Sequence, residues 1–278
     1  METMEKRPSI NFLFDEIITC GAVLSAFELC EAVRKLGREC NIIAKFKNKE
    51  LEEYFNIEKI GHHGRPEGID ITFTPKMHGD YAYVRTNDKR WLRHDEPIIA
   101  VSKYIQDTIG GSVVIGNGTH ERFYNMHLGE NLEDWEHVQP NLVYKRDIDV
   151  LIEGNYEPNK NIVETIKEAR KHGRRIVWFG RTTKNLGVEH CSGLSLDEIV
   201  SLYNRSKKFL KMSKDEGWGR PIAEAKACGC EIINKSGGNK DIEIVSWESI
   251  AKQLIKYLDD RQNEIPLRDT TNRKNPCR

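Results

Sequence analysis

The sequence of 278 residues lacks the hallmarks of several large protein classes. Its seven cysteines are an odd number without a Cys-x-x-Cys pair, which disfavours a disulfide scaffold or a zinc site and fits a reducing cytoplasm. No stretch reaches the roughly 18 apolar residues that cross a bilayer, and residues 1–14 lack the apolar core of a signal peptide. Basic and acidic residues balance at 43 each, so no nucleic acid is expected as a partner.

What is present is the composition of a soluble globular protein, with 38% apolar and 31% charged residues. In the first half, short apolar runs alternate with a segment whose apolar residues recur at helical spacing. Residues 10–14 and 40–46 are predicted to be strands, and residues 21–37 are predicted to be a helix that ends at a glycine. Further strands are predicted near residues 68–75, 96–102 and 112–118. This alternation is typical of a parallel sheet in an α/β fold.

The second half repeats the pattern. We predict strands over 147–154, 174–180, 207–213 and 230–234, and helices over 159–173, 195–206, 220–229 and 246–260. A polar, irregular run at 125–143 marks a domain boundary. The expected organisation is an N-terminal, acceptor-side Rossmann-like domain (1–143), a C-terminal donor-binding Rossmann-like domain (144–246), a terminal helix returning toward the first domain (247–262) and a polar tail (263–278).

Residues 213–232 carry the chemistry that is most specific in the sequence. Pro221 suits the first turn of a helix, and the loop before it follows a predicted strand, at the end where parallel α/β sheets bind ligands. Gly217 and Gly219 allow the backbone to approach a ligand closely. The start of the helix offers free N–H groups and a positive dipole end, which together suit a diphosphate.

Two acids frame this loop, Glu216 at its mouth and Glu224 one turn into the helix. Glu216 suits the hydroxyls of a sugar and Glu224 those of a ribose, which is the order of groups in a nucleotide-sugar. A purely structural interpretation stays open, because a glutamate near a helix start is favoured by about 0.3–1 kcal/mol through the helix dipole alone.

The run "EGWGRPIAEAKACGCEIINKSGG" resembles the donor-site signature of retaining glycosyltransferases of the GT-B fold, the glycosyl transferases group 1, which also resemble glycogen synthases. The pattern is two glutamates with seven residues between them, enclosing Gly-aromatic-Gly-x-Pro, followed by a strand and Gly-Gly. The resemblance is specific over residues 209–238 and looser elsewhere.

The resemblance implies roles for individual residues. Glu216 contacts the transferred sugar and Glu224 the nucleotide ribose, while the amides of Gly217, Trp218 and Gly219 line the sugar and diphosphate. Lys160 matches a lysine that holds the diphosphate. The family has an arginine where this chain has Asn155, a departure for which Arg181, Lys184 or Arg220 would have to compensate.

Two residues of the first half complete the predicted site. Gly21 resembles the family's glycine turn that faces the diphosphate, although a simple turn glycine is an equal alternative. His78 is the best candidate for a polar group near the reacting carbon, against the commoner alternative of a surface histidine. Glu216, Lys160 and His78 are thus the catalytic candidates, and no acidic or histidine cluster indicates a metal.

The sequence therefore predicts a GT-B fold, with two Rossmann-like domains facing a central cleft and a shortened N-terminal domain. The predicted activity is transfer of a sugar from a nucleotide-diphosphate sugar to an acceptor hydroxyl with retention at the anomeric carbon, without a metal or other cofactor. A nucleotide-sugar epimerase and a non-catalytic nucleotide-sugar binder remain alternatives. The acceptor, whether saccharide, lipid or protein, stays open, as does peripheral contact of a cytoplasmic protein with a membrane.

Overall fold

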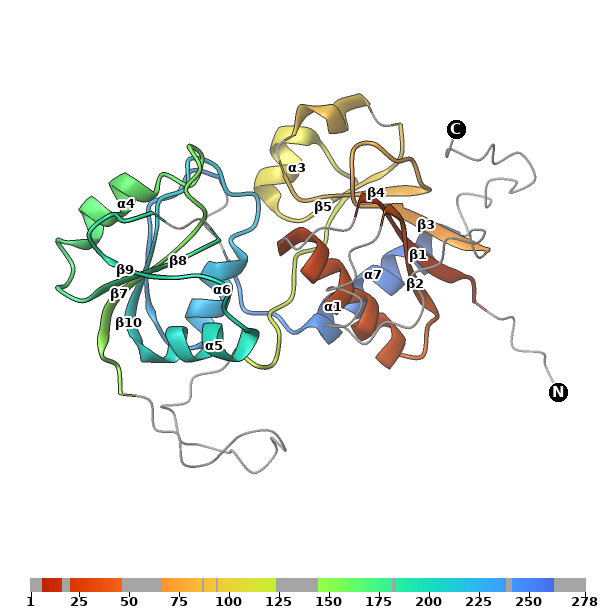
Figure 1. The fold of residues 1–278 in the computed structure, drawn as a ribbon. Helices are drawn as coiled ribbons and strands as arrows, with labels where there is room; N and C mark the ends of the chain where they lie inside the picture. Colours follow the sequence, from red (N-terminus) through yellow and green to blue (C-terminus); the bar gives the residue numbers. More distant parts are fainter. Residues whose placement is uncertain are drawn as a thin grey trace. The chain divides into compact units, whose positions relative to one another are not determined.

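The computed structural model describes residues 7–16, 21–46, 67–86, 88–93, 95–123, 145–181, 184–238 and 242–262. The chain folds as two compact units, each built on its own parallel sheet (Figure 1). The first contains residues 1–118 and 245–278, and the second contains residues 119–244. The predicted boundary at 143–144 and the predicted tail at 263–278 lie outside the described residues.

The sheet of the first unit has the strand order β2-β1-β3-β4-β5-β6, and every neighbouring pair is parallel. Phe12, Leu13 and Phe14 follow one another along β1 and are all buried. Consecutive buried residues are expected where helices cover both faces of a parallel sheet. The strands are β1 (Ser9–Glu16), β2 (Cys40–Phe46), β3 (Gly68–Thr72), β4 (Tyr81–Val84), β5 (Ile98–Ala100) and β6 (Val113–Val114).

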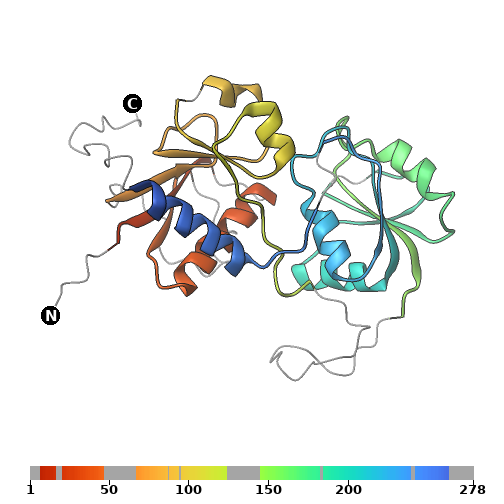
Figure 2. The same cartoon turned by 180° about the vertical axis from the view of Figure 1, so that it is seen from behind.

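The helical elements of the first unit include the predicted helix after the first strand. It ends near Gly37, whose φ of 81° is the left-handed conformation common after a helix C-terminus. The last helix packs against it, which brings the two chain segments of this unit together (Figure 2). These elements are α1 (Gly21–Lys35), the 3₁₀ helix η1 (Lys89–Arg93), α3 (Lys103–Ile109) and α7 (Trp247–Gln262).

The sheet of the second unit has the order β11-β10-β7-β8-β9 and is again fully parallel. All four strands predicted from the sequence are present, and β9 is an additional short strand. The strands are β7 (Ile148–Glu153), β8 (Ile176–Phe179), β9 (Glu189–Cys191), β10 (Ser206–Lys211) and β11 (Glu231–Asn234).

Helices cover both faces of this second sheet (Figure 1). One apolar cluster, with Trp178 and Leu210, packs with residues of α4 (Ile162–Ala169). A second cluster, with Tyr203 and Phe209, packs with residues of α5 (Leu196–Arg205) and α6 (Arg220–Ala227). In the sequence, Ser195 followed three residues later by Glu198 predicts a capping box, and this capping box is present at the start of α5. Phe123, which the sequence prediction places in the N-terminal domain, packs against Tyr203 in this unit.

Asp149 ties together the beginnings of three neighbouring strands. Its Oδ2 accepts the backbone N–H groups of Arg174 and Arg175, at 2.9 and 3.0 Å, and its Oδ1 accepts from Nζ of Lys207 at 2.7 Å. The hydrogen bond from Lys207, together with those from the two backbone amides, lowers the pKa of Asp149 from 3.8 to about 2.

We expect the Asp149→Asn variant to be less stable than the wild type at neutral pH, by an amount that shrinks in acid. Because the folded-state pKa is depressed, the carboxylate stabilises the fold above the unfolded value of 3.8, and this contribution is lost as the pH falls through about 2. Urea unfolding at a series of pH values measures the difference. Asp197→Asn, which changes a carboxylate that is 85% exposed, is the control and should alter stability little. A pH-independent difference for Asp149→Asn would contradict the expectation.

Candidate functional site

The strand order of the second unit defines one place where neighbouring loops diverge. The chain runs from β7 to β8 and β9 on one side, and then returns to place β10 on the other side of β7. The loops that follow β7 and β10 therefore leave the carboxyl end of the sheet in opposite directions. Ligands of open α/β sheets bind at such a switch point. Both predicted donor loops, one with Lys160 and one with Glu216, begin here.

The backbone holds these loops together. The N–H of Lys214, in the loop after β10, donates to the carbonyl of Asn159 in the loop after β7, at 2.8 Å. The loop after β11 joins from the other side, since the N–H of Glu216 donates to Gly237 at 3.1 Å and the N–H of Gly237 donates to Ser213 at 2.9 Å. Three strand ends therefore share one hydrogen-bonded frame, which fixes the main chain at Glu216.

Four charged side chains meet in this frame. The Nζ of Lys160 lies 3.6 Å from Oε2 of Glu216, and the Nζ of Lys211 lies 3.9 Å from the same oxygen. Lys211 is also hydrogen-bonded to the carboxylate of Glu153. Oε2 of Glu216 is buried and accepts no hydrogen bond within the described residues. The carboxylate is thus held by the charges of two ammonium groups.

Glu224 lies in a second cluster of polar side chains, which is mostly buried. One of its oxygens accepts from Nε of Arg220 at 2.6 Å, and the other accepts from the hydroxyl of Tyr203 at 3.2 Å. Burial and the neighbouring Glu224 carboxylate raise the pKa of Tyr203 well above its ordinary value, so its hydroxyl remains a hydrogen-bond donor. Arg220 and Tyr203 therefore fix the Glu224 carboxylate in one orientation.

The start of α6 offers backbone donors beside these side chains. Gly219 is the N-cap residue, and Pro221 lies in the first turn. The N–H groups of Trp218 and Gly219 donate to no backbone carbonyl of the described chain. The indole of Trp218 packs on the core below α6. Because the Trp218 side chain is packed in this way, the backbone of the loop from Gly217 to Gly219 lies at the positive end of the α6 dipole.

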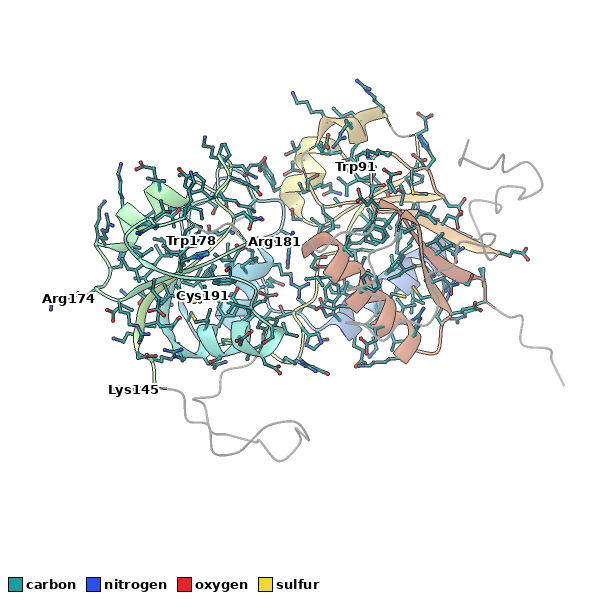
Figure 3. The ribbon with its side chains drawn as sticks, viewed as in Figure 1. Trp91, Lys145, Arg174, Trp178, Arg181 and Cys191 are labelled. Carbon is teal, nitrogen blue, oxygen red and sulfur yellow. The ribbon has the colours of Figure 1, made fainter. Side chains whose placement is uncertain are left out.

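Asn155, which stands where the family has an arginine, has a structural role. Its Oδ1 accepts the backbone N–H of Arg181 at 3.0 Å, and its Nδ2 donates to Glu157 at 3.2 Å. It therefore joins the loops that follow β7 and β8. Of the three residues expected to compensate for the missing charge, Arg220 is paired with Glu224 and Lys184 lies over the ring of Tyr156, 3.9 Å from its centroid. Arg181 is exposed at the carboxyl end of β8 (Figure 3).

Gly21 and His78 belong to the first unit and are described within it, whereas the donor loops belong to the second. The sheet of the first unit has its own switch point between β1 and β3. Gly21 is the first residue of the helix after β1, and His78 lies in the loop after β3. His78 has a 70% exposed side chain, and its Nδ1 lies 2.7 Å from Oε1 of the buried Glu96.

Lys211 and Glu153 are the site residues that the sequence prediction missed. Each is the last residue of its strand, and the two strands are neighbours. From the sequence alone, a lysine that ends the run "KKFLK" is expected to be exposed to solvent, yet the Lys211 side chain is only 3% exposed. Only the positions of the two residues in the sequence could have indicated their role. Each charged residue directly follows the apolar part of a strand, at the end of the sheet where ligands bind.

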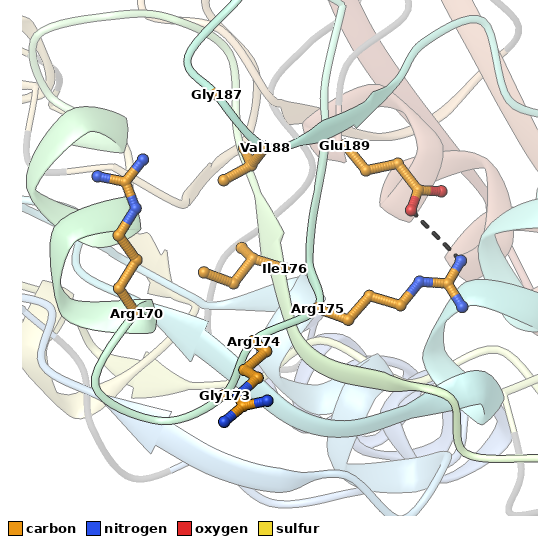
Figure 4. Close-up of a pocket in the computed structure, with 8 residues that line it drawn as sticks. All are labelled: Arg170, Gly173, Arg174, Arg175, Ile176, Gly187, Val188 and Glu189. Atoms are coloured by element: carbon orange, nitrogen blue, oxygen red, sulfur yellow. Dashed lines mark hydrogen bonds and ion pairs between the residues drawn. The ribbon is translucent and has the colours of Figure 1, made fainter.

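A separate hollow of about 530 Å³ lies at the opposite end of the second sheet, where β8 and β9 begin. Figure 4 shows Ile176 and Val188 at its centre, with Arg175 turned toward Glu189 at 3.3 Å. It lies at the amino ends of the strands, so it is not part of the candidate site. Over the described ranges, no three acidic, histidine or cysteine side chains gather where they could hold a metal. No helix in the same ranges has the length and apolar character to cross a membrane.

Comparison with solved structures defines the fold class. The chain is similar to a sucrose-phosphate synthase from Thermosynechococcus elongatus, with a TM-score of 0.65 and 12% identity over 93% of this chain and all of that one. It is also similar to AviGT4, a glycosyltransferase involved in avilamycin A biosynthesis (TM-score 0.63, 13% identity, 93% and 99% coverage). Anabaena HepE, solved with UDP and glucose, gives a TM-score of 0.59 at 16% identity over 92% and 91%.

These similarities show that the chain has the GT-B fold, with two Rossmann-like domains, as the sequence predicted. At these identities the likeness establishes the fold alone. No protein-family model and no curated protein sequence matches the chain. The chemistry of this particular protein must therefore be argued from its own residues.

We expect Gly238→Ala to destabilise the protein more than Gly193→Ala. Both glycines have left-handed backbones, with φ of 84° and 66°, so each substitution costs about 1–2 kcal/mol for that conformation. At Gly238 the new Cβ would also lie 2.4 Å from the carbonyl oxygen of Glu216, whereas at Gly193 it would meet nothing within 4 Å. Urea unfolding compares the two variants. Equal losses of stability would show that the loops after β10 and β11 are not packed as described.

Proposed function

We propose that the protein transfers a sugar from a nucleotide-diphosphate sugar to an acceptor hydroxyl, with retention of the anomeric configuration. The observation that carries this is the meeting of Lys160 and Glu216 at the switch point, 3.6 Å apart, beside the start of α6. It places a cation, a carboxylate and free backbone N–H groups where open α/β sheets bind ligands. The GT-B fold and the donor signature in the sequence support the same activity.

The arrangement matches the parts of a nucleotide-sugar in order. Glu216 would accept hydrogen bonds from hydroxyls of the sugar. Lys160 and the amides of Trp218 and Gly219 would hold the diphosphate, while Glu224, fixed by its neighbours, would accept from the ribose. HepE was solved with UDP and glucose, which supports a nucleotide-sugar as the donor here.

The reaction breaks the bond between the anomeric carbon and the diphosphate oxygen, so negative charge builds on the diphosphate while positive charge develops on the ring. Groups that are already oriented toward the developing charge lower the barrier without reorganising. Lys160 and the α6 amides serve the leaving group, and the negative Glu216 favours a ring that is becoming positive. This charge balance requires no metal ion. His78, with its imidazole oriented by Glu96, would be the polar group that the first domain provides.

The activity is tested by incubating the protein with a panel of nucleotide-sugars, with and without saccharide and lipid acceptors. Release of nucleoside diphosphate that depends on the acceptor, with a product of the donor's anomeric configuration by NMR, supports the proposal. Conversion of the donor without an acceptor would indicate an epimerase instead. Binding without turnover across the panel would indicate a non-catalytic binder, and an inverted product would refute retention.

We expect Glu224→Gln to weaken binding of the nucleoside diphosphate itself, by about 1–2 kcal/mol, because a charged acceptor for ribose hydroxyls becomes neutral. Titration calorimetry measures the affinity. Glu231→Gln is the matched control, since it makes the same substitution on a 63% exposed side chain at the start of β11, at the other end of the sheet. Unchanged affinity in a folded Glu224→Gln variant would rule out this role.

Glu216→Gln should lower turnover strongly while leaving the affinity for free nucleoside diphosphate nearly unchanged. The substitution keeps the shape of the side chain but removes the charge that favours the developing positive ring, and interactions that strengthen in the transition state act on kcat. Steady-state kinetics and calorimetry on the same preparation separate the two effects. Lost nucleotide affinity with normal turnover at saturation would mean that the two glutamates have exchanged roles.

A further inference from the structure

Lys211 is a buried ammonium group at the carboxyl end of β10, which lies next to the central strand β7 of the second sheet. Its side chain is 3% exposed. Its Nζ lies 3.3 Å from the carbonyl oxygen of Glu153 and also donates to the Glu153 carboxylate. Burial acts to lower the pKa of Lys211, but the carboxylates of Glu153 and Glu216 outweigh it and raise the pKa above its ordinary value. The group therefore carries its positive charge at neutral pH.

Stability alone does not account for this ion pair. Removing two charges from water costs several kcal/mol for each ion, and apolar residues of similar volume often give an equally stable or more stable fold. Phe209 and Leu210, which precede Lys211 along β10, are fully buried and apolar. Lys211 is the last residue of β10, and the loop that carries Glu216 begins after it.

The donors of Lys211 are only partly engaged by Glu153. An ammonium group has three N–H donors, and two are directed at the carbonyl and carboxylate of Glu153. The remaining side of Nζ faces Oε2 of Glu216, 3.9 Å away, while Lys160 approaches the same oxygen to 3.6 Å. Because Oε2 is buried between two ammonium groups, Oε1 is the oxygen that we expect to meet a ligand.

We propose that Lys211, anchored by Glu153, is a positioning residue that holds the Glu216 carboxylate from behind and so directs its other oxygen at the sugar. This inference rests on the proposed function, and it adds a residue pair that the donor signature does not contain. It also gives the site a second cation where Asn155 replaces the family's arginine, placed behind the sugar-binding carboxylate instead of beside the diphosphate.

The test uses the full chain with the double substitution Glu153→Gln and Lys211→Met. Removing Lys211 alone would leave Glu153 without its partner and endanger the fold, whereas removing both charges together avoids an uncompensated buried ion. Lys207→Met is the matched control, because Lys207 forms the ion pair of the same two strands at their other end, with Asp149. Unfolding curves establish that each variant is folded.

We expect the double variant to keep the wild-type affinity for nucleoside diphosphate while its kcat falls by about tenfold or more, the factor that corresponds to about 1.4 kcal/mol of lost transition-state stabilisation. Lys207→Met should retain the wild-type kcat. A role in stability alone would lower the unfolding midpoint without this split between binding and turnover.

Two outcomes would overturn the proposal. A folded double variant with wild-type turnover would show that Glu216 does not depend on Lys211. A loss of nucleoside diphosphate affinity as large as the loss of turnover would show that Lys211 serves the diphosphate directly. Failure of the proposed function itself is distinguishable, because the wild-type protein would then show no acceptor-dependent sugar transfer for the variants to lose.

Discussion

The parallel pairing of β7 with β10 is the constraint on which the candidate site depends. It aligns Leu210 with Ile152, so both strands end at the same level of the sheet. The chain reaches β10 only after building β8 and β9 on the far side of β7, which makes the two following loops diverge. Lys160 and Glu216, which are 56 positions apart by their numbering, meet because of this register.

The same pairing brings opposite charges together at both of its ends. At the beginning, Asp149 binds Lys207, whose side chain is 52% exposed, so water screens the attraction between the two charges. At the end, Glu153 binds the buried Lys211, where desolvation is costly and the pair has electrostatic influence on its surroundings. The pairing of a carboxylate with a lysine therefore has different consequences at the two ends, because one pair is hydrated and the other borders the site.

Much of the fold follows from local sequence signals. The helix α1 was predicted from apolar spacing and its glycine stop, and α5 from the capping box of Ser195 and Glu198. The short strands β4 and β9 were missed. β9 has the sequence Glu-His-Cys, with neither an apolar run nor alternation, and it exists because β8 provides a partner. Such strands are determined by tertiary pairing and leave little trace in local sequence.

The candidate site divides in a similar way. The glycine loop, the two glutamates and Lys160 could be proposed from motif and resemblance, because their spacing along the chain is itself informative. Arg220 was expected to compensate for the missing arginine, yet its position four residues before Glu224 on one helix already allowed the ion pair that the structure shows. Lys211 and Glu153 could not be paired without the strand register, which no local pattern contains.

The loops around Glu216 are joined mainly through the main chain, by the amides of Lys214, Glu216 and Gly237. Such bonds do not depend on which side chains the loops carry. Natural drift or directed evolution can therefore exchange exposed residues such as Lys214 without dismantling the frame, provided that the glycines which permit its close approaches are kept. The scaffold is in this sense evolvable: the ligand preference of the candidate site can change at a few positions while its backbone geometry is kept.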